Sequence, residues 1–220
     1  MSAISRLRRL PYRVVRRFGS ADHSRFFGCD LENLSGVPCP EGLVAVQLAE
    51  RDLLGYFGEE NCLDDTHVCW LRDEVAICYA VLDGTTLAGF AWIGFGDVPG
   101  ELNHNGHPDT QLPVFLPANM GFVSHVFVLP AYRGQRLYAA LLSFAAESLP
   151  ALGIDKLVLT TECTNTSALC SVRRMGFETL GEAWIMKLGP FCTVGYPPQP
   201  FFGGVRTGRF AGDPHERSNG

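Results

Sequence analysis

The stretch from residue 120 to residue 142 limits most strongly what this chain can fold into. Its first part, residues 121–129, is an apolar run rich in β-branched and aromatic residues that ends at Pro130, which predicts a β-strand. From Arg136 onward, apolar residues recur at the spacing of one helix face, so we expect a helix there. The stretch therefore predicts a strand, a short loop and a helix in direct succession.

The loop between these two elements has the composition of an anion site. The first N–H groups of a helix have no intrahelical acceptor, and the helix dipole favours negative charge at that end. Gly134 lets the backbone approach a ligand closely, and Arg133 and Arg136 add positive charge. We therefore expect this loop to bind a phosphate-bearing ligand.

Two segments resemble motifs of one family. Residues 128–142, VLPAYRGQRLYAALL, resemble the cofactor-binding motif of the GNAT superfamily of N-acetyltransferases, Gln/Arg-x-x-Gly-x-Gly/Ala. Residues 165–177, NTSALCSVRRMGF, are similar to the second motif of that superfamily. The two segments stand in the family's order with a strand expected between them, and the resemblance covers roughly residues 43–188.

The resemblance implies a fold of the α/β (α+β) class, with a central mixed, mostly antiparallel sheet flanked by helices in a single domain. It also implies acetyl-CoA as co-substrate, with its pyrophosphate on the loop amides and its pantetheine arm beside the motif strand. The residues that would bind this cofactor are Val126, Phe127, Val128, Arg133, Gly134, Gln135, Arg136, Leu137, Tyr138 and Asn165.

The chain departs from the family pattern at three positions. Arg136 stands at the first motif glycine and Tyr138 at the last Gly/Ala. Val172 replaces a tyrosine that often serves the family as general acid for the leaving thiolate. That acid is then missing or supplied elsewhere, although a thiolate is already a stable leaving group.

The implied mechanism is direct attack of a neutral amine on the thioester, which requires a group that removes the amine's proton. The candidates are His125, Ser124 and Glu162, and His125 ranks first because histidine titrates near neutral pH. A histidine that only packs in the core is an equally valid interpretation of His125. Regular alternation places Ser124, but not His125, on the face of Val126, and a β-bulge would exchange them.

Charge and composition limit the possible partners. The 220 residues carry a net charge of −5, yet residues 1–17 hold six arginines and no acid, so the remainder is strongly acidic. This favours a small amine substrate over nucleic acid, and no apolar run is long enough for an integral membrane segment. We expect a basic arm and irregular lead-in at 1–42, the acyltransferase domain at 43–190 and an extended tail at 191–220.

Eight cysteines without a Cys-x-x-Cys pair predict reduced thiols in a cytoplasmic protein, with no metal site. His104 and His107 lie in a long connection, residues 97–119, but two histidines alone are weak evidence for a metal. We interpret this connection as a substrate-recognition insertion beside the acceptor pocket. The sequence leaves a homodimer possible.

Local patterns predict the remaining elements. Strands are expected at 43–48, 76–83, 86–96, 156–163 and 177–189, and helices at 49–60, 64–72 and from 165 onward. The helix at 49–60 should turn Leu53, Leu54 and Phe57 inward, and Asp83-Gly84 should close a hairpin.

These patterns favour an N-acetyltransferase acting on a primary amine of a small molecule. One alternative is a module of the same fold that binds acyl-CoA without turnover, consistent with the altered motif positions. A second is a protein docked to a membrane or partner by the arginine-rich arm at 1–17.

Overall fold

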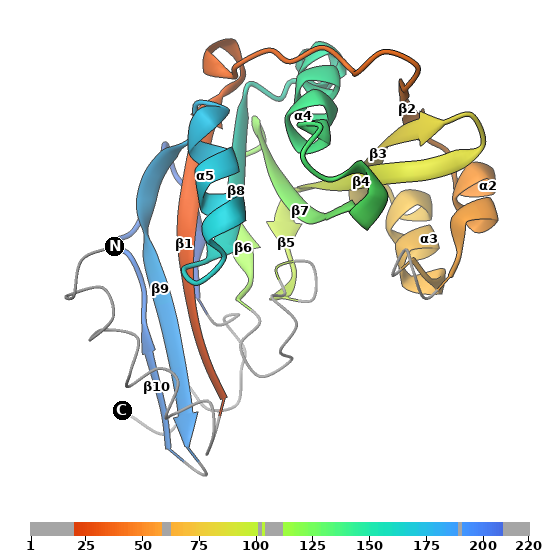
Figure 1. Ribbon diagram of the computed structural model, residues 1–220. Coiled ribbons are helices and arrows are strands. Elements are labelled where there is room, and N and C mark those ends of the chain that lie inside the picture. The colour runs from red at the N-terminus through yellow and green to blue at the C-terminus, as the bar shows by residue number, and fades with distance from the viewer. Residues whose placement is uncertain (1–19, 59–62, 101–102, 104–111, 189–190, 209–220) are drawn as a thin grey trace.

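A central eight-stranded sheet organises the protein in the order β10-β9-β1-β8-β7-β4-β3-β2 (Figure 1). The computed structural model describes residues 20–58, 63–100, 103, 112–188 and 191–208. The strands are β1 Ser20–Asp30, β2 Val44–Leu48, β3 Ala76–Asp83, β4 Thr86–Phe95, β7 Met120–Val128, β8 Lys156–Glu162, β9 Glu178–Leu188 and β10 Phe191–Gly195. Neighbouring strands in this sheet are antiparallel except β7 and β8, which are parallel.

A second, three-stranded sheet has the order β11-β6-β5. Its strands are β5 Asp97–Val98, β6 Val114–Phe115 and β11 Arg206–Thr207. The α-helices of the described chain are α2 Glu50–Leu53, α3 Asp65–Arg72, α4 Leu137–Ser148 and α5 Thr166–Arg174. Short 3-10 turns are η1 Leu31–Asn33, η2 Leu54–Tyr56, η5 Pro130–Tyr132 and η6 Leu149–Leu152. None of these described helices combines the length and hydrophobicity needed to cross a membrane.

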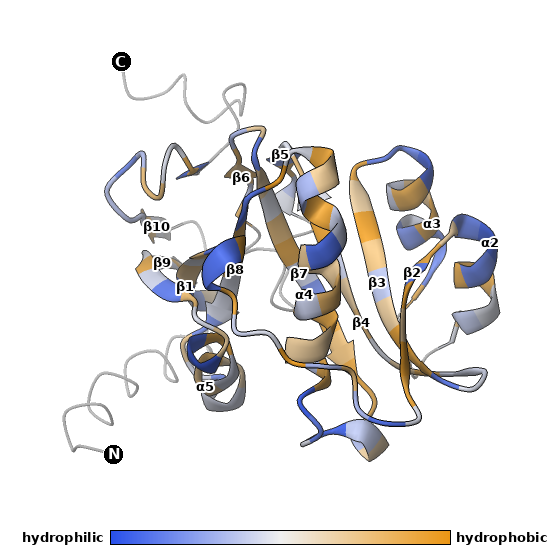
Figure 2. Ribbon diagram, turned by 90° about the horizontal axis from the view of Figure 1, so that it is seen from above, coloured by the Kyte–Doolittle hydropathy of each residue, from blue (hydrophilic) through white to orange (hydrophobic). Residues whose placement is uncertain are grey.

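The helices cover both faces of the large sheet. Side chains alternate between the two faces along each strand, so each face has apolar residues that a helix can bury. On β3, Tyr79 and Val81 belong to the core cluster that α4 and α5 complete, whereas Cys78 and Ala80 pack with residues of α2 and α3. Figure 2 shows β3 as strongly hydrophobic and α2 as mainly hydrophilic, as expected for a buried strand and a surface helix.

Strands β7 and β8 separate partway along their length, and this separation positions the site. Their parallel pairing joins residues 120–123 to residues 156–159 and extends no further in the described chain. Beyond it, β7 continues to Val128 and curves away from β8 (Figure 1). In the part of the chain that the structure describes, no strand therefore neighbours the β8-facing edge of β7 over residues 124–128.

A β-bulge interrupts β7 in this separated part. Phe90 of β4 faces Phe127 and Trp92 faces Ser124, so two residues of β7, His125 and Val126, oppose one residue of β4. His125 has a φ of 45°, a left-handed conformation that is uncommon outside glycine. The bulge breaks the regular alternation on which the relative placement of Ser124 and His125 depended.

Several expectations for local structure are confirmed. The strands at 43–48, 76–83, 86–96, 156–163 and 177–189 correspond to β2, β3, β4, β8 and β9. The helices expected at 64–72 and from 165 onward correspond to α3 and α5. Their first turns are capped by side chains: Asp64 accepts a hydrogen bond from the Thr66 amide, and Asn165 accepts one from the Ala168 amide.

The expectation of an irregular lead-in before residue 43 was wrong for residues 20–30. Residues 20–30 form β1, which is paired on both sides, with β8 and with β9. The extended tail was also wrong in part, because residues 191–195 form β10 and Val205 is fully buried in a core cluster. The fold therefore includes residues from both sides of 43–190. The arginine-rich arm at 1–17 lies outside the described residues.

The helix expected at 49–60 is shorter than predicted. It consists of α2 and the η2 turn, and it buries Leu53 while Leu54 is 54% exposed, so the inward placement of Leu54 was wrong. The connection at 97–119 contains β5 and β6 rather than loop alone, and His104 and His107 lie outside the described residues.

Candidate active site

The loop between β7 and α4 presents backbone donors at a helix N-terminus. Gly134 has a φ of +83°, and Arg136, the N-cap of α4, has a φ of 62°. The first intrahelical hydrogen bond runs from the Ala140 amide to the Arg136 carbonyl at 3.1 Å. The amides of residues 137–139 therefore have no acceptor within the helix, and the helix dipole adds positive potential beside them.

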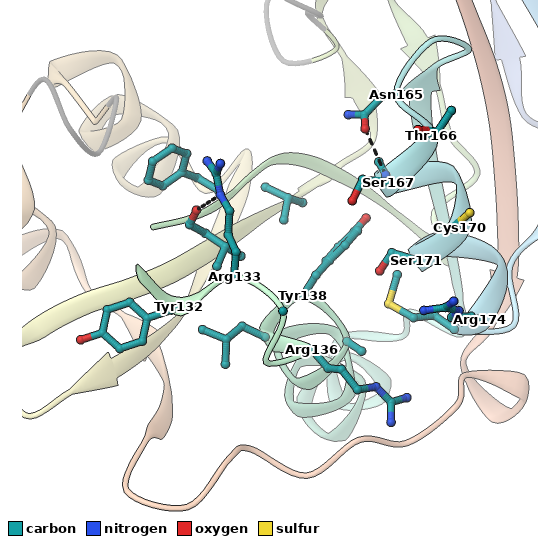
Figure 3. A pocket seen from close by; sticks show the side chains of 18 residues that line it. Tyr132, Arg133, Arg136, Tyr138, Asn165, Thr166, Ser167, Cys170, Ser171 and Arg174 are labelled. Carbon is teal, nitrogen blue, oxygen red and sulfur yellow. Dashed lines mark hydrogen bonds between the residues drawn. The ribbon is translucent and has the colours of Figure 1, made fainter. Parts of the chain in front are cut away.

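A first cavity of about 720 Å³ opens in front of this helix end, between the end of β7 and α5 (Figure 3). It brings together most of the residues expected to bind a cofactor. The expected residues that line it are Val126, Phe127, Val128, Arg133, Gly134, Arg136, Leu137, Tyr138 and Asn165. Gln135 is exposed and is not part of this lining.

Positive charge reaches the first cavity from two elements. Arg133 and Arg136 come from the loop, and Arg174 comes from the last turn of α5. Arg174 was not among the expected site residues, although its place in the second motif could have identified it. Guanidinium groups pair well with phosphate oxygens, so the cavity suits a polyanionic ligand.

Tyr138 projects from the first turn of α4 toward α5 (Figure 3). Burial raises the pKa of its phenol well above the ordinary value, so the hydroxyl keeps its proton at neutral pH. Val172, at the position where the family often has a tyrosine, is fully buried in the main core. Tyr138 therefore places a phenol beside α5, although it belongs to α4 and not to the helix that carries Val172.

A second cavity, of about 320 Å³, lies between the separated ends of β7 and β8. All three residues expected to act on the amine, Ser124, His125 and Glu162, line it. Four residues line both cavities: Val126, Tyr138, Asn165 and Ala168. The two cavities therefore adjoin along these four side chains.

Two polar side chains of the second cavity stand out, the expected Ser124 and the unexpected Asn103. Ser124 is 6% exposed, and its hydroxyl has no hydrogen-bond partner in the described chain, which is unusual for a buried polar atom. Asn103, which lies in the connection interpreted as a substrate-recognition insertion, also lines this cavity. The side-chain Nδ2 of Asn103 donates to the backbone carbonyl oxygen of Leu112 at 2.8 Å, and its side-chain Oδ1 accepts from the Thr160 hydroxyl.

One residue that was not among the expected site residues contacts His125, and a second contacts the first. His67 of α3 places its Nε2 atom 2.8 Å from His125 Nδ1. The other ring nitrogen of His67 lies 2.8 Å from a carboxylate oxygen of Asp64. Burial lowers the pKa of His67 despite the opposing effect of Asp64, so the imidazole is neutral near pH 7. Sequence spacing carries no signal for this contact, because α3 and β7 are distant in the chain.

A possible metal-ligand group lies elsewhere, at the junction of β1, β8 and β9. His23, Cys163 and Glu182 place ligand atoms within 4.8 Å of one another. Glu182, however, is ion-paired with Arg25 and lies 3.0 Å from His23 Nε2. Since the carboxylate already has a cationic partner, this group is explained without a metal.

Comparison with solved structures shows related folds at low identity. A GCN5-related N-acetyltransferase from Kribbella flavida is 16% identical, with a TM-score of 0.51, over 79% of this chain and 61% of that chain. A Drosophila protein is 14% identical, with a TM-score of 0.51, over 84% of this chain and 57% of that chain. A tandem GNAT protein from the clavulanic acid biosynthesis pathway is 15% identical, with a TM-score of 0.50, over 83% and 60%.

These matches span 57–61% of the length of the three solved proteins. No curated protein matches the chain significantly. Residues 45–177 match the model of the Acetyltransferase (GNAT) family, and this match covers more than half of the sequence. The mostly antiparallel sheet flanked by helices agrees with that match, and the chain therefore belongs to the GNAT acetyltransferase family.

Proposed function

We propose that the protein is an N-acetyltransferase that transfers an acetyl group from acetyl-CoA to a primary amine of a small molecule. The observation that carries this proposal is the pair of adjoining cavities at the separation of β7 and β8. One cavity is cationic and faces a helix N-terminus, and the other contains a carboxylate, an imidazole and a buried hydroxyl. A phosphate-bearing donor and a cationic acceptor thus each have a complementary site.

The first cavity fits coenzyme A by its donor set. Amides of residues 137–139 without intrahelical acceptors and three guanidinium groups match the needs of a diphosphate. The edge of β7 beyond its pairing with β8 offers backbone groups of Val126 and Val128 to the amide-bearing arm of the cofactor, in the manner of an added strand. When bound, acetyl-CoA supplies an activated acyl group as a thioester.

The residues of the second cavity would act on the acceptor. The Glu162 carboxylate would attract a protonated amine, and the Ser124 hydroxyl would offer it a hydrogen-bond partner. His125 would accept the proton that the amine must lose before it can attack, so it is our candidate general base. A volume of about 320 Å³ lies at the lower end of the usual range for ligand pockets, which favours a small acceptor.

The test measures release of free thiol from acetyl-CoA with a panel of primary amines, together with acetyl-CoA binding by native mass spectrometry. We expect binding and amine-dependent thiol release. His125→Gln should lower kcat by about 100-fold, as for loss of a general base. The matched control is His23→Gln, a histidine that lines neither cavity. Absence of acetyl-CoA binding by the wild-type protein would reject the proposal.

The second candidate function is an acyl-CoA-binding module without turnover. It is favoured by Arg136 and Tyr138, whose side chains replace small motif residues beside the proposed diphosphate site. Binding of acetyl-CoA without thiol release on any amine would support this module. A cytoplasmic location, a homodimer and a role for the arm at 1–17 stay predictions.

A further inference from the structure

We propose that Asp64 and His67 position His125 and carry the proton that it removes from the amine out to solvent. Asp64, His67 and His125 form the His125 relay, a chain of ionisable side chains that links the second cavity to the surface. The inference rests on the proposed function, because His125 is its general base. His125 would be the catalytic residue, and the other two would be positioning residues.

The geometry of the His125 relay is continuous. His125 Nδ1 lies 2.8 Å from His67 Nε2, and His67 Nδ1 lies 2.8 Å from Asp64 Oδ1. The side chain of His67 is 5% exposed, whereas that of Asp64 is 67% exposed. His125 is itself exposed where it lines the second cavity, so the buried imidazole of His67 connects an exposed cavity residue to a carboxylate in water.

Hydrogen positions follow from these contacts. His67 Nδ1 also lies 3.2 Å from the Asp64 amide, and one nitrogen cannot accept from that amide while donating to the carboxylate. We assign the hydrogen to Nδ1, because the contact with the carboxylate is shorter and charge-assisted. His67 Nε2 then accepts from the Nδ1–H of His125, and the basic lone pair of His125 lies on Nε2.

The proton would leave the amine through a series of transfers between neighbouring groups. An N–H bond of the ammonium breaks and a bond to His125 Nε2 forms, which leaves a neutral amine. The Nδ1 proton of His125 moves to His67 Nε2, and the Nδ1 proton of His67 moves to the Asp64 carboxylate and then to water. Each imidazole ends neutral, and one proton has crossed from the cavity to solvent.

The surroundings of the His125 relay are mostly apolar. The rings of Trp70 and Trp92 pack against His67 at centroid distances of 4.5 and 5.3 Å. These contacts fix the imidazole and exclude water around it, so hydrogen bonds to its nitrogens are strengthened. Among the described residues, the titratable groups that face the relay are Asp64 of the α3 cap and, around the second cavity, Glu162 of β8 and Tyr138 of α4. Cys78 of β3 and Tyr56 of the η2 turn belong to the core cluster that contains Trp92.

The decisive variant is Asp64→Asn. Asparagine caps a helix about as well as aspartate, so the start of α3 should be preserved while the carboxylate is lost. The matched control is Asp65→Asn, which removes the same charge from the next residue. A second variant, His67→Gln, interrupts the relay at its centre, and its thermal unfolding shows whether the buried site tolerates the change.

Kinetics and NMR titration together test the inference. We expect Asp64→Asn to lower kcat about tenfold, to move the acidic limb of the pH profile of kcat to lower pH, and to leave KM for acetyl-CoA unchanged. By NMR, the titration midpoints of both His67 and His125 should fall in Asp64→Asn, because the anion that stabilises their charged forms is lost. Asp65→Asn should change neither readout, and His67→Gln should also lower the midpoint of His125.

Failure of the relay and failure of the proposed function give different results. A midpoint of His125 that is equal in the wild-type protein and Asp64→Asn would overturn the relay, even if thiol release is normal. Coupled midpoints without thiol release on any amine would reject the acetyltransferase assignment and support the relay as a structural proton path.

Discussion

Arg133 donates a hydrogen bond from Nε to the backbone carbonyl oxygen of Val128, 3.2 Å away (Figure 3). This bond ties the loop to the end of β7, on the strand that we propose to hold the pantetheine arm. It also places a guanidinium group in the first cavity, beside the amides of α4. The same side chain therefore shapes the loop and contributes charge, and these two roles can be separated by mutation.

Arg133→Gln should raise the Kd for acetyl-CoA about tenfold, because a charge-assisted hydrogen bond contributes about 1.5–3 kcal/mol and part of it is retained by glutamine. It should also reduce the dependence of Kd on salt. Calorimetric titration at two ionic strengths measures both. Arg133→Lys should restore the salt dependence, and Arg51→Gln, an exposed charge on α2, should change nothing. Equal Kd values for Arg133→Gln and Arg51→Gln would mean that Arg133 only holds the loop against β7 and contributes nothing to acetyl-CoA binding.

Tyr138 should control the junction of the two cavities, since its side chain lines both. Tyr138→Ala removes the ring and should raise the activity with longer acyl-CoAs relative to acetyl-CoA. Tyr138→Phe keeps the ring and should keep the acyl preference, but it should lower kcat about tenfold if the hydroxyl serves the leaving thiolate in place of the missing tyrosine at Val172. Steady-state kinetics with acyl-CoAs of increasing length separates the two effects. An unchanged acyl preference in Tyr138→Ala would contradict this role.

Two neighbouring loop positions should respond oppositely to a change of side chain. Gly134 has a φ of +83°, and an added Cβ would meet no atom within 4 Å, so Gly134→Ala should cost about 1 kcal/mol of unfolding free energy from backbone strain alone. Arg136 already carries this strain at a φ of 62°, so Arg136→Gly should be neutral or stabilising by up to about 1 kcal/mol. Urea denaturation measures both. If both variants lost a similar amount of unfolding free energy, side-chain contacts and not backbone conformation would determine the effect of substitutions at these two positions.

The motif region could be predicted from sequence because its structure is local. An apolar run, Pro130 and the helical spacing after Arg136 specify a strand, a turn and a helix within a few turns of chain. The cap of α5 by Asn165 is equally local. The family resemblance then supplied the arrangement of these elements in space, which no local pattern contains.

Strand β1 could not be predicted because its burial depends on distant strands. It carries Asp22, Ser24 and Gly28, which weaken a strand pattern, yet it lies between β8 and β9 and buries Asp22 and Ser24. Such burial reflects pairing with residues more than 120 positions away, as in the register of Asp30 with Lys156. The contact of His67 with His125, 58 residues apart, was missed for the same reason.

The lowered pKa of His67 should make folding stability depend on pH. Burial lowers the pKa of His67 below its ordinary value of 6.5, so below about pH 6.5 the unfolded chain binds a proton that the folded chain does not. The unfolding free energy should therefore fall as pH decreases from about 6.5, by at most about 1.4 kcal/mol per pH unit from this residue.

The carboxylate of Asp64 changes folding stability only at lower pH values than His67 does. Burial would raise its pKa, but hydrogen bonds from His67 and Thr66 hold it below the ordinary value of 3.8, so its contribution is lost only below that pH. Urea denaturation at pH 7.5 and pH 5.0 thus isolates His67 from Asp64. His67→Gln should lose less stability than the wild-type protein between these two pH values. Equal losses in the two proteins would mean that His67 is solvated or protonated in the folded state, and that the imidazole does not form the neutral link between Asp64 and His125.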